Sequence, residues 1–302
     1  MVYTLADGLV RVYPVGEGVP RPGPGLVWAH GGGFVAGDLD MPEADWVARA
    51  FVARGIPVVS VDYRLVGDGS GRFPAGSDDV LAAWAWTLDH ADELGIDPAR
   101  LVIGGASAGA NLVTGAVLRL LGHGTAPGLD TGAARPTRPA DAVVPAGVFL
   151  AYPTLLAVQP APDASLRAAL DANPEADRFG PDRVREMYET YLGGPVDDAP
   201  LVAVPGLAEP ADLAGFPPTL MVNGDTDELR VSGEAFAVTL AAADVPIELA
   251  LEPGTEHGHL NRPDEPGASA TVARIADWIA RGFVPGASAS QTTLRITEGI
   301  TS

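Results

Sequence analysis

Two residue types are missing from this chain of 302 residues: it contains no cysteine and no lysine. Without cysteine there are no disulfides, no thiolate metal sites and no cysteine nucleophile. Without lysine there is no Schiff base, no pyridoxal-phosphate anchor, no phosphate-binding P-loop and no serine–lysine dyad, because each of them needs that amine. Two whole classes of chemistry are therefore excluded.

Positive charge is scarce as well, because 19 basic residues, all of them arginine, oppose 39 acidic ones and leave a net charge of −20. Such a charge repels phosphate backbones and anionic lipid headgroups, so we expect no nucleic-acid partner and no stable membrane association. The apolar runs are of strand length or are broken by glycine and proline, too short to span a bilayer. Met1 to Tyr13 lack a basic region followed by an apolar run, which predicts no secretory signal and a cytoplasmic location. A monomer and a homodimer are both compatible with the sequence.

Apolar residues, which make up 47% of the chain, form short runs that alternate with longer helical patterns. This alternation predicts an α/β fold with a mostly parallel central sheet and helices on both faces, where strands are buried on both sides. The expected strands are Leu9–Tyr13, Gly25–Ala29, Pro57–Asp62, Arg100–Gly104, Val143–Ala151, Thr219–Val222 and Pro246–Leu251. The expected helices are Ala44–Arg54, Ser77–Glu93, Ala108–Leu121, Gly233–Ala243 and Ser269–Phe283.

Three segments interrupt the alternation. Residues 122–141 are rich in glycine, alanine and proline and predict a loop. Residues 152–216 contain helical stretches at Ala164–Ala172 and Pro181–Leu192 without a convincing strand. They predict a helical cap, or lid, inserted into a core made of residues 1–151 and 217–284. Residues 285–302 have few bulky apolar side chains and predict a flexible tail.

The pattern Gly105-Ala106-Ser107-Ala108-Gly109 follows an expected strand and opens the next helix. A nucleophile elbow requires this context: the turn strains the serine, small neighbours avoid clashes, and the hydroxyl protrudes at the helix N-terminus. A glycine-rich turn is the alternative interpretation of the pattern alone. Its place between a buried strand and a helix favours Ser107 as a nucleophile.

His30 is followed by three glycines, Gly31, Gly32 and Gly33, directly after the strand expected to end at Ala29. Three consecutive glycines are costly in backbone entropy. They are required where peptide N–H groups approach a developing oxyanion and a Cβ would be in the way. A plain flexible loop is the alternative, but a glycine triplet led by histidine upstream of the serine pattern favours an oxyanion loop.

Five histidines are available as the general base. His30 belongs to the glycine loop, His90 to a charged helix end and His123 to a glycine-rich loop. His257 and His259 remain, in the loop after the last strand, where hydrolases with such an elbow keep their base. A metal site at this His-x-His pair is the alternative, but no further ligand spacing supports one.

The acid that orients the base is expected between serine and histidine, at the end of the penultimate strand. Asp225 and Asp227 follow that strand, and Glu228 is a third candidate. Asp225 lies beside Gly224 and also suits a turn-forming role. The spacing leaves the choice between the two aspartates open.

Taken together, these motifs resemble the hormone-sensitive-lipase-like family of α/β-hydrolases, a group of bacterial esterases and acetyl hydrolases. The likeness covers roughly Pro24 to Ile279. It includes, in order, HGGGFVAGD (His30–Asp38), VDYRL (Val61–Leu65), FPAGSDDV (Phe73–Val80), IGGASAGANL (Ile103–Leu112), GFPPTLMVNGDTDEL (Gly215–Leu229) and PGTEHGH (Pro253–His259).

The resemblance implies an α/β-hydrolase fold and selects among the candidates. In the family the acid lies two residues before a leucine, which here selects Asp227. The base precedes a glycine after a P-G turn, which selects His257. The family's oxyanion donors are backbone N–H groups of the last two motif glycines and of the residue after the serine, here Gly32, Gly33 and Ala108.

Three features depart from the family pattern. Ala106 stands where the family often has aspartate, at a position outside the triad. The usual A-P-E after YRL is replaced by Val66-Gly67-Asp68, which is expected to change the pocket rim. About two dozen residues precede the core strand and resemble strand and turn, whereas family members commonly carry an N-terminal helical cap segment. A more open site is expected from this difference.

The resemblance and the residues together predict a serine carboxylesterase that hydrolyses short- to medium-chain neutral esters through an acyl-enzyme. Its triad would be Ser107, His257 and Asp227, its partner a small-molecule ester, and no metal or organic cofactor is implied. An amidase, a lactonase or a transacylase would use the same triad. A non-catalytic binding protein of the hydrolase fold is the alternative outside enzymes.

Overall fold

The computed structural model describes residues 2–67, 69–124 and 142–284 of the chain. At its centre lies an eight-stranded sheet in the order β1-β2-β4-β3-β5-β6-β7-β8. The strands are β1 (Tyr3–Leu5), β2 (Val10–Tyr13), β3 (Gly23–Ala29), β4 (Val58–Val61), β5 (Ile96–Ala106), β6 (Gly147–Ala151), β7 (Thr219–Thr226) and β8 (Ile247–Glu256). Strands β3 to β8 pair in parallel, while β2 pairs antiparallel with both β1 and β4. The predicted mostly parallel sheet is confirmed.

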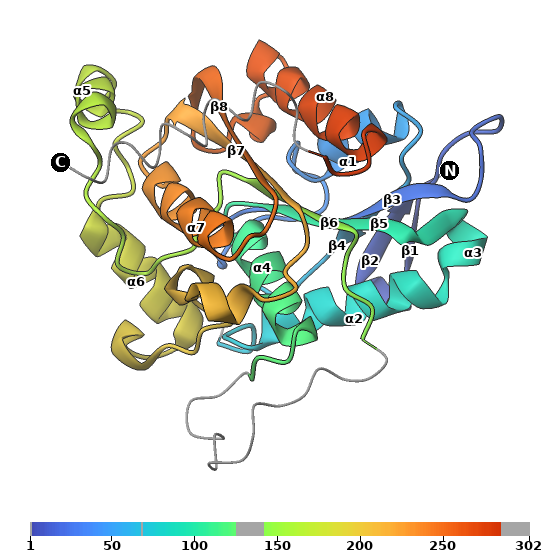
Figure 1. The fold of residues 1–302 in the computed structure, drawn as a ribbon, viewed down its shortest axis with the longest axis horizontal. Coiled ribbons are helices and arrows are strands. Elements are labelled where there is room, and N and C mark those ends of the chain that lie inside the picture. Colours follow the sequence, from blue (N-terminus) through green and yellow to red (C-terminus); the bar gives the residue numbers. More distant parts are fainter. Residues whose placement is uncertain (1, 68, 125–141, 285–302) are drawn as a thin grey trace.

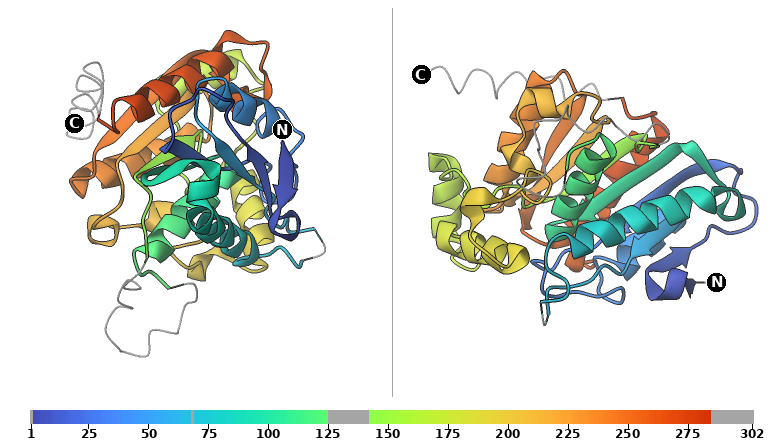
Figure 2. Two further views of the ribbon diagram at one scale, coloured as in Figure 1. Left: turned by 90° about the vertical axis from the view of Figure 1, so that its right-hand side faces the viewer. Right: turned by 90° about the horizontal axis from the view of Figure 1, so that it is seen from below.

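Helices cover both faces of this sheet (Figures 1 and 2). One face carries α1 (Asp45–Val52) and α8 (Pro266–Ala280), and the other carries α2 (Ala75–Asp89), α3 (Ala91–Leu94), α4 (Ala108–Leu120) and α7 (Arg230–Ala242). Neighbouring residues of one strand alternate between the two layers: Leu26 and Trp28 of β3 pack in the α1 and α8 layer, and Val27 packs in the opposite one. Burial on both faces explains why the strands are continuously apolar.

The segment between β6 and β7 is described in full and contains no strand. It forms α5 (Ala164–Ala172) and α6 (Pro181–Leu192), which lie at the left of Figure 1 beside α7, and then three short 3-10 helices. The Asp163 carboxylate caps α5 by accepting the Leu166 N–H at 2.7 Å. The helical stretches predicted here are confirmed, whereas the division of the chain into a core and a separate cap at 152–216 stays a prediction.

Several boundaries differ from the predicted ones. The strand predicted from Val143 begins only at Gly147, because Pro145 has no N–H for the ladder and the Val143 carbonyl accepts the Trp84 indole N–H at 3.0 Å. The helix predicted over 77–93 is divided at His90 into α2 and α3. The N-terminal segment forms β1, a 3-10 turn and β2, as its strand-and-turn composition indicated.

None of the helices in the described ranges combines the length and the apolar composition needed to cross a bilayer. The tail predicted over 285–302 and most of the loop predicted over 122–141 lie outside the described residues.

Candidate active site

Ser107 lies at a sharp turn between β5 and α4. Its backbone has φ 51° and ψ −116°, a conformation that residues with a side chain rarely adopt. The turn is fixed by the Ser107 N–H, which donates to the Ala151 carbonyl at 2.9 Å. In the first turn of α4, Gly109 lies so close to β3 that a Cβ there would be 2.2 Å from the His30 carbonyl oxygen. The Gly-x-Ser-x-Gly pattern thus forms the strained, tightly packed elbow that the sequence indicated.

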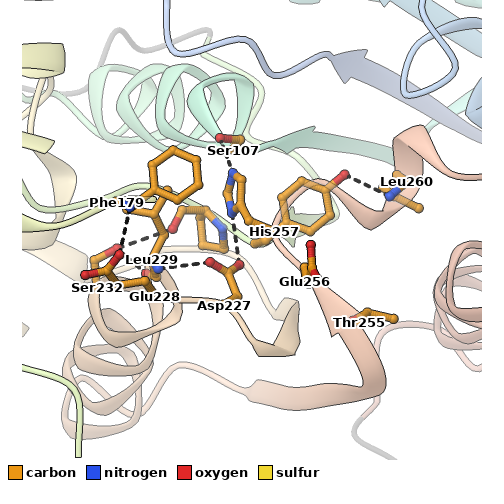
Figure 3. A network of polar contacts seen from close by, with 12 residues as sticks. Ser107, Phe179, Asp227, Glu228, Leu229, Ser232, Thr255, Glu256, His257 and Leu260 are labelled. Atoms are coloured by element: carbon orange, nitrogen blue, oxygen red, sulfur yellow. Dashed lines mark hydrogen bonds and ion pairs between the residues drawn. The ribbon is translucent and has the colours of Figure 1, made fainter. Parts of the chain in front are cut away.

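The Ser107 hydroxyl faces the loop that follows β8. Its Oγ lies 2.9 Å from Nε2 of His257, and Nδ1 of His257 lies 2.9 Å from Oδ2 of Asp227 (Figure 3). Oδ1 of Asp227 accepts the Leu229 N–H at 2.9 Å, so both carboxylate oxygens are bonded. Asp227 is fully buried, whereas Ser107 and His257 are 8% and 9% exposed. The three side chains therefore form one hydrogen-bonded chain that runs from the interior to an accessible surface.

Asp225, the other candidate acid, makes different contacts. Its carboxylate accepts the N–H groups of Gly254 at 2.8 Å and Thr255 at 3.2 Å. It therefore braces the turn that leads into the histidine loop. Glu228, the third candidate, accepts the Phe179 N–H at 2.7 Å (Figure 3), and burial raises the pKa of Glu228 above its usual 4.5. Of the three acids, only Asp227 lies against His257.

His259 is fully buried and points toward α8, where its Nε2 lies 2.8 Å from Oγ1 of Thr271. Burial lowers the pKa of His259 from 6.5 to about 4, because the imidazolium would lose its hydration there. His259 is therefore neutral at neutral pH. The structure brings His257, and not His259, against Ser107.

The glycine loop after β3 lies across from the elbow, since a Cβ added to Gly31 would be 3.1 Å from Cβ of Ser107. Gly32 has φ 131°, and a Cβ there would lie 1.8 Å from the Ala36 carbonyl oxygen, so only glycine fits. Within the described part of the chain, the N–H groups of Gly32 and Gly33 donate to no other protein group. They are available to a ligand beside the serine.

Ala108, the third predicted oxyanion donor, is the first residue of α4. The first N–H groups of a helix have no acceptor within it. The positive end of the helix dipole also lies at this point, which favours a developing negative charge. The candidate donors thus come from two segments next to Ser107, the glycine loop after β3 and the first turn of α4.

A pocket of about 380 Å³ opens over Ser107 and His257. One helix, α6, contributes four lining residues, namely Arg183, Glu186, Met187 and Thr190. The remaining wall comes from Gly31, Gly32, Gly33, Val35, Met41, Glu43, Phe179, Gly258 and Asn261. The Phe179 ring packs edge-on against His257, with ring centroids 4.7 Å apart. The candidate triad therefore lies at the floor of a pocket that α6 partly covers.

Two residues that the sequence analysis did not single out lie beside the pocket floor. Glu43 is 2% exposed, and its Oε2 accepts the Gly31 N–H at 2.5 Å. The Tyr152 hydroxyl donates to Oε1 of Glu43 at 2.6 Å, and the Tyr152 ring packs edge-on against His257 at 5.0 Å. Glu43 belongs to no local motif. Tyr152 directly follows β6, and the carboxyl edge of a parallel sheet, where sites gather, is the signal that could have found it.

The alternative of a metal site at the histidine pair can be compared with the contacts of the two side chains. His257 contacts Ser107 and Asp227, while His259 contacts Thr271. Across residues 2–67, 69–124 and 142–284, no three histidine, cysteine, aspartate or glutamate side chains are grouped so that they could hold a metal ion.

Known proteins are similar to this chain in sequence. A family model described as the alpha/beta hydrolase fold matches residues 26–261. The carboxylesterase NlhH of Mycobacterium tuberculosis is 36% identical over 263 residues, which are 85% of this chain and 72% of that protein. The ethyl acetate hydrolase of Pseudomonas putida is 32% identical over 256 residues, which are 82% of this chain and 70% of that protein.

Solved structures agree with these relatives. An esterase of the bacterial hormone-sensitive lipase family is similar with a TM-score of 0.73 and 26% identity, over 94% of this chain and 84% of that one. Esterase LipW of Mycobacterium marinum is similar with a TM-score of 0.70 and 27% identity, over 94% of this chain and 81% of that one. The chain therefore belongs to the α/β-hydrolase family of enzymes, in its hormone-sensitive-lipase-like group.

Proposed function

We propose that the chain is a serine carboxylesterase whose triad consists of Ser107, His257 and Asp227. The observation that carries this proposal is the hydrogen-bonded chain at the pocket floor, with 2.9 Å at each of its two contacts. A serine hydroxyl is a weak nucleophile unless an adjacent base takes its proton, and the base in turn needs a group that orients it. The relatives named carboxylesterase and ethyl acetate hydrolase support the same reaction class.

In the acylation step, Oγ of Ser107 forms a bond to the ester carbonyl carbon while Nε2 of His257 takes the hydroxyl proton. Asp227 holds the imidazole in the required tautomer and stabilises the imidazolium. The carbonyl oxygen becomes an oxyanion, for which the N–H groups of Gly32, Gly33 and Ala108 are the proposed donors. In comparable sites one such donor contributes about 10²–10³ in rate.

The acyl-enzyme then forms and is hydrolysed. The bond between the carbonyl carbon and the alcohol oxygen breaks, and the alcohol leaves with the proton from His257. A water molecule gives a proton to His257 and attacks the acyl carbonyl. The bond to Oγ breaks, the carboxylic acid leaves, and Ser107 regains its proton.

The substrates that we propose are neutral esters with short or medium acyl chains, on the basis of the size and the lining of the pocket. Its volume is about 380 Å³, and Val35, Met41 and Met187 supply apolar lining. Of the two acidic residues that line it, Glu186 is paired with Arg183 at 3.1 Å, whereas the buried Glu43 opposes an anionic acyl group, because charges of one sign repel strongly in a low-dielectric cleft. In a panel that varies acyl length and alcohol size separately, kcat/KM should fall for long acyl chains. A maximum at palmitoyl esters would contradict the assignment.

The same triad would serve an amidase, a lactonase or a transacylase, since the fold and the catalytic groups are shared among these reactions. Amide, lactone and acyl-acceptor substrates measured beside the ester panel separate them by kcat/KM. A binding protein would hold the ester without releasing the acid.

Ser107→Ala tests the nucleophile. Losing Oγ should lower kcat for p-nitrophenyl acetate by on the order of 10⁶, as in measured triads. The matched control is Ser60→Ala, a buried serine of β4 outside the pocket, which should keep the parent activity. A fluorophosphonate should label the parent on Ser107. An adduct on another serine would overturn the assignment.

A further inference from the structure

A buried carboxylate lies directly beneath the glycine loop. Glu43 precedes α1, is 2% exposed and accepts three hydrogen bonds. Its Oε2 accepts the Gly31 N–H at 2.5 Å, and its Oε1 accepts the Tyr152 hydroxyl at 2.6 Å and the Asn261 side-chain N–H at 3.1 Å. A buried charge is costly unless it is well bonded, and bonds to a carboxylate are stronger than neutral ones. The three donors are therefore held firmly around this side chain.

The three donors come from three different parts of the pocket. Gly31 begins the glycine loop, Tyr152 follows β6, and Asn261 lies just after the loop that carries His257. A second set of bonds strengthens the link to that loop. Oδ1 of Asn261 accepts the Glu43 N–H at 3.2 Å, and the Tyr152 hydroxyl accepts the Leu260 N–H at 3.3 Å. One side chain thus joins the loop of the candidate oxyanion donors to the loop of the candidate base.

Tyr152 is a permanent donor in this network. Burial and the nearby Glu43 carboxylate raise the pKa of Tyr152 well above its usual 10, so the hydroxyl keeps its proton. Its ring stands edge-on to both His257 at 5.0 Å and His259 at 4.9 Å. Glu43 is therefore also linked to both histidines of this loop, through the ring of Tyr152.

The contacts on either side of Gly31 fix the peptide planes of the loop. Glu43 holds the plane that carries the Gly31 N–H. The Tyr63 hydroxyl donates to the His30 carbonyl of the same plane at 2.8 Å. The next plane carries the Gly31 carbonyl and the Gly32 N–H, and its carbonyl oxygen lies 2.7 Å from Nδ1 of His30. Glycine on its own is conformationally permissive. The direction of the Gly32 N–H is therefore set by side chains that hold Gly31 from both ends.

We infer that Glu43 is a positioning residue for the ester hydrolysis proposed above, which holds Gly31 so that the Gly32 and Gly33 N–H groups point to the forming oxyanion. The inference rests on the proposed function. Donors that are already oriented stabilise the transition state without reorganisation, and they matter less to the ground-state carbonyl. Loss of Glu43 should therefore lower kcat and leave KM nearly unchanged.

The test compares Glu43→Met, which keeps the size of the side chain but accepts no hydrogen bond, with Glu43→Gln, which keeps an acceptor for Gly31. We measure kcat and KM for p-nitrophenyl acetate and the inhibition constant of a trifluoromethyl ketone, which adds to a reactive serine and forms an oxyanion. Glu43→Met should lose about 10²–10³ in kcat, the effect of one oxyanion donor. Its KM should stay within about threefold of the parent, and the ketone should bind weaker by the same factor as kcat falls. Glu43→Gln should stay within about tenfold of the parent in kcat, because its amide oxygen still accepts the Gly31 N–H.

The matched control is Glu248→Gln, a buried carboxylate at the start of β8 that pairs with Arg281 at 3.2 Å, far along the chain from the glycine loop. It should keep the parent kcat and ketone affinity. If Glu43→Met does not fold, Glu43→Asp, which withdraws the carboxylate from Gly31 by one methylene, carries the same expectation with a smaller loss.

A parent-like kcat in Glu43→Met, or a fall in kcat without weaker ketone binding, overturns the positioning role. The same holds if Glu43→Gln is as impaired as Glu43→Met. These outcomes differ from a failure of the proposed function, in which the parent itself would neither turn over esters nor react with a fluorophosphonate.

Discussion

The buried His259 predicts a loss of stability when the pH falls from 7 to 5. In the folded chain burial lowers its pKa to about 4, whereas an exposed histidine in the unfolded chain has its usual value of 6.5. Below pH 6.5 the unfolded state therefore binds one more proton than the folded state, and the free energy of unfolding decreases. The contribution of His259 is fully present above pH 6.5 and is lost as the pH falls through its folded pKa.

The size of this effect follows from the two pKa values. A separation between 6.5 and about 4 corresponds to roughly 3 kcal/mol at low pH, since one pKa unit is equivalent to about 1.4 kcal/mol. At pH 5 the unfolded state is almost fully protonated and the folded state hardly at all, so about 2 kcal/mol of this is already lost. A loss of that size is a large fraction of the 5–15 kcal/mol (approximately) that holds a typical domain folded.

Urea unfolding at pH 7 and pH 5, followed by tryptophan fluorescence, measures the effect. The variant His259→Gln keeps a polar group that can reach Thr271 but does not titrate. Between the two pH values the parent should lose about 2 kcal/mol more than the variant, whatever the variant costs at pH 7. Subtracting the change in the variant from the change in the parent cancels the contributions of the other titrating groups. Equal losses would mean that His259 takes up its proton in the folded state, which would refute the reasoning.

Two further predictions concern the site itself. Asp227→Asn should fold normally and keep its KM but lose about 10⁴ in kcat, because His257 is then held in the wrong tautomer. Asp225→Asn weakens the turn at Gly254 and should lower the melting temperature by a few degrees with kcat within about tenfold of the parent. If steady-state kinetics and calorimetry give the reverse pattern, the two aspartates exchange roles. Gly32→Ala introduces a Cβ that would lie 1.8 Å from the Ala36 carbonyl oxygen, so the loop must move. The kcat of this variant should fall at least about 10²-fold. Turnover at the parent rate would show that the Gly32 N–H does not bind the oxyanion.

The sequence predicted the elements that depend on local patterns. The elbow at Ser107 needed only a buried strand, small residues and a helix in succession, all between Ile96 and Leu120. The choice between Asp225 and Asp227 was different, because it came from a family resemblance. The physical reason for the choice is the position at which β7 ends. This strand continues to Thr226, so Asp225 is still within it and bonds to the end of β8. Asp227 is the first residue beyond it and is free to turn toward His257.

Contacts between distant residues could not be predicted in this way. Glu43 meets Tyr152 across 109 positions and Asn261 across 218, and no periodicity or turn signal joins the three. The predicted strand Val143–Ala151 is present as β6, but its predicted start at Val143 was wrong for a related reason. Its β-branched residues suit a strand, but the chain pairs with β5 only from Gly147, and tertiary contacts override the local preference.

Helix α6 lines the pocket but contributes none of the proposed catalytic residues. Its four lining residues, Arg183, Glu186, Met187 and Thr190, recur at the spacing of one helix face, and they belong to the segment between β6 and β7. The elbow lies between β5 and α4, His257 follows β8, and Glu43 lies between β3 and α1, so none of them belongs to that segment. Exchanging side chains along this single helix face is therefore a route by which a new ester can be accommodated while the proposed triad stays intact. We expect substitutions that change the substrate range to be tolerated best in the 12 residues of α6. A library confined to this helix is the natural starting point for changing the substrate specificity of this enzyme.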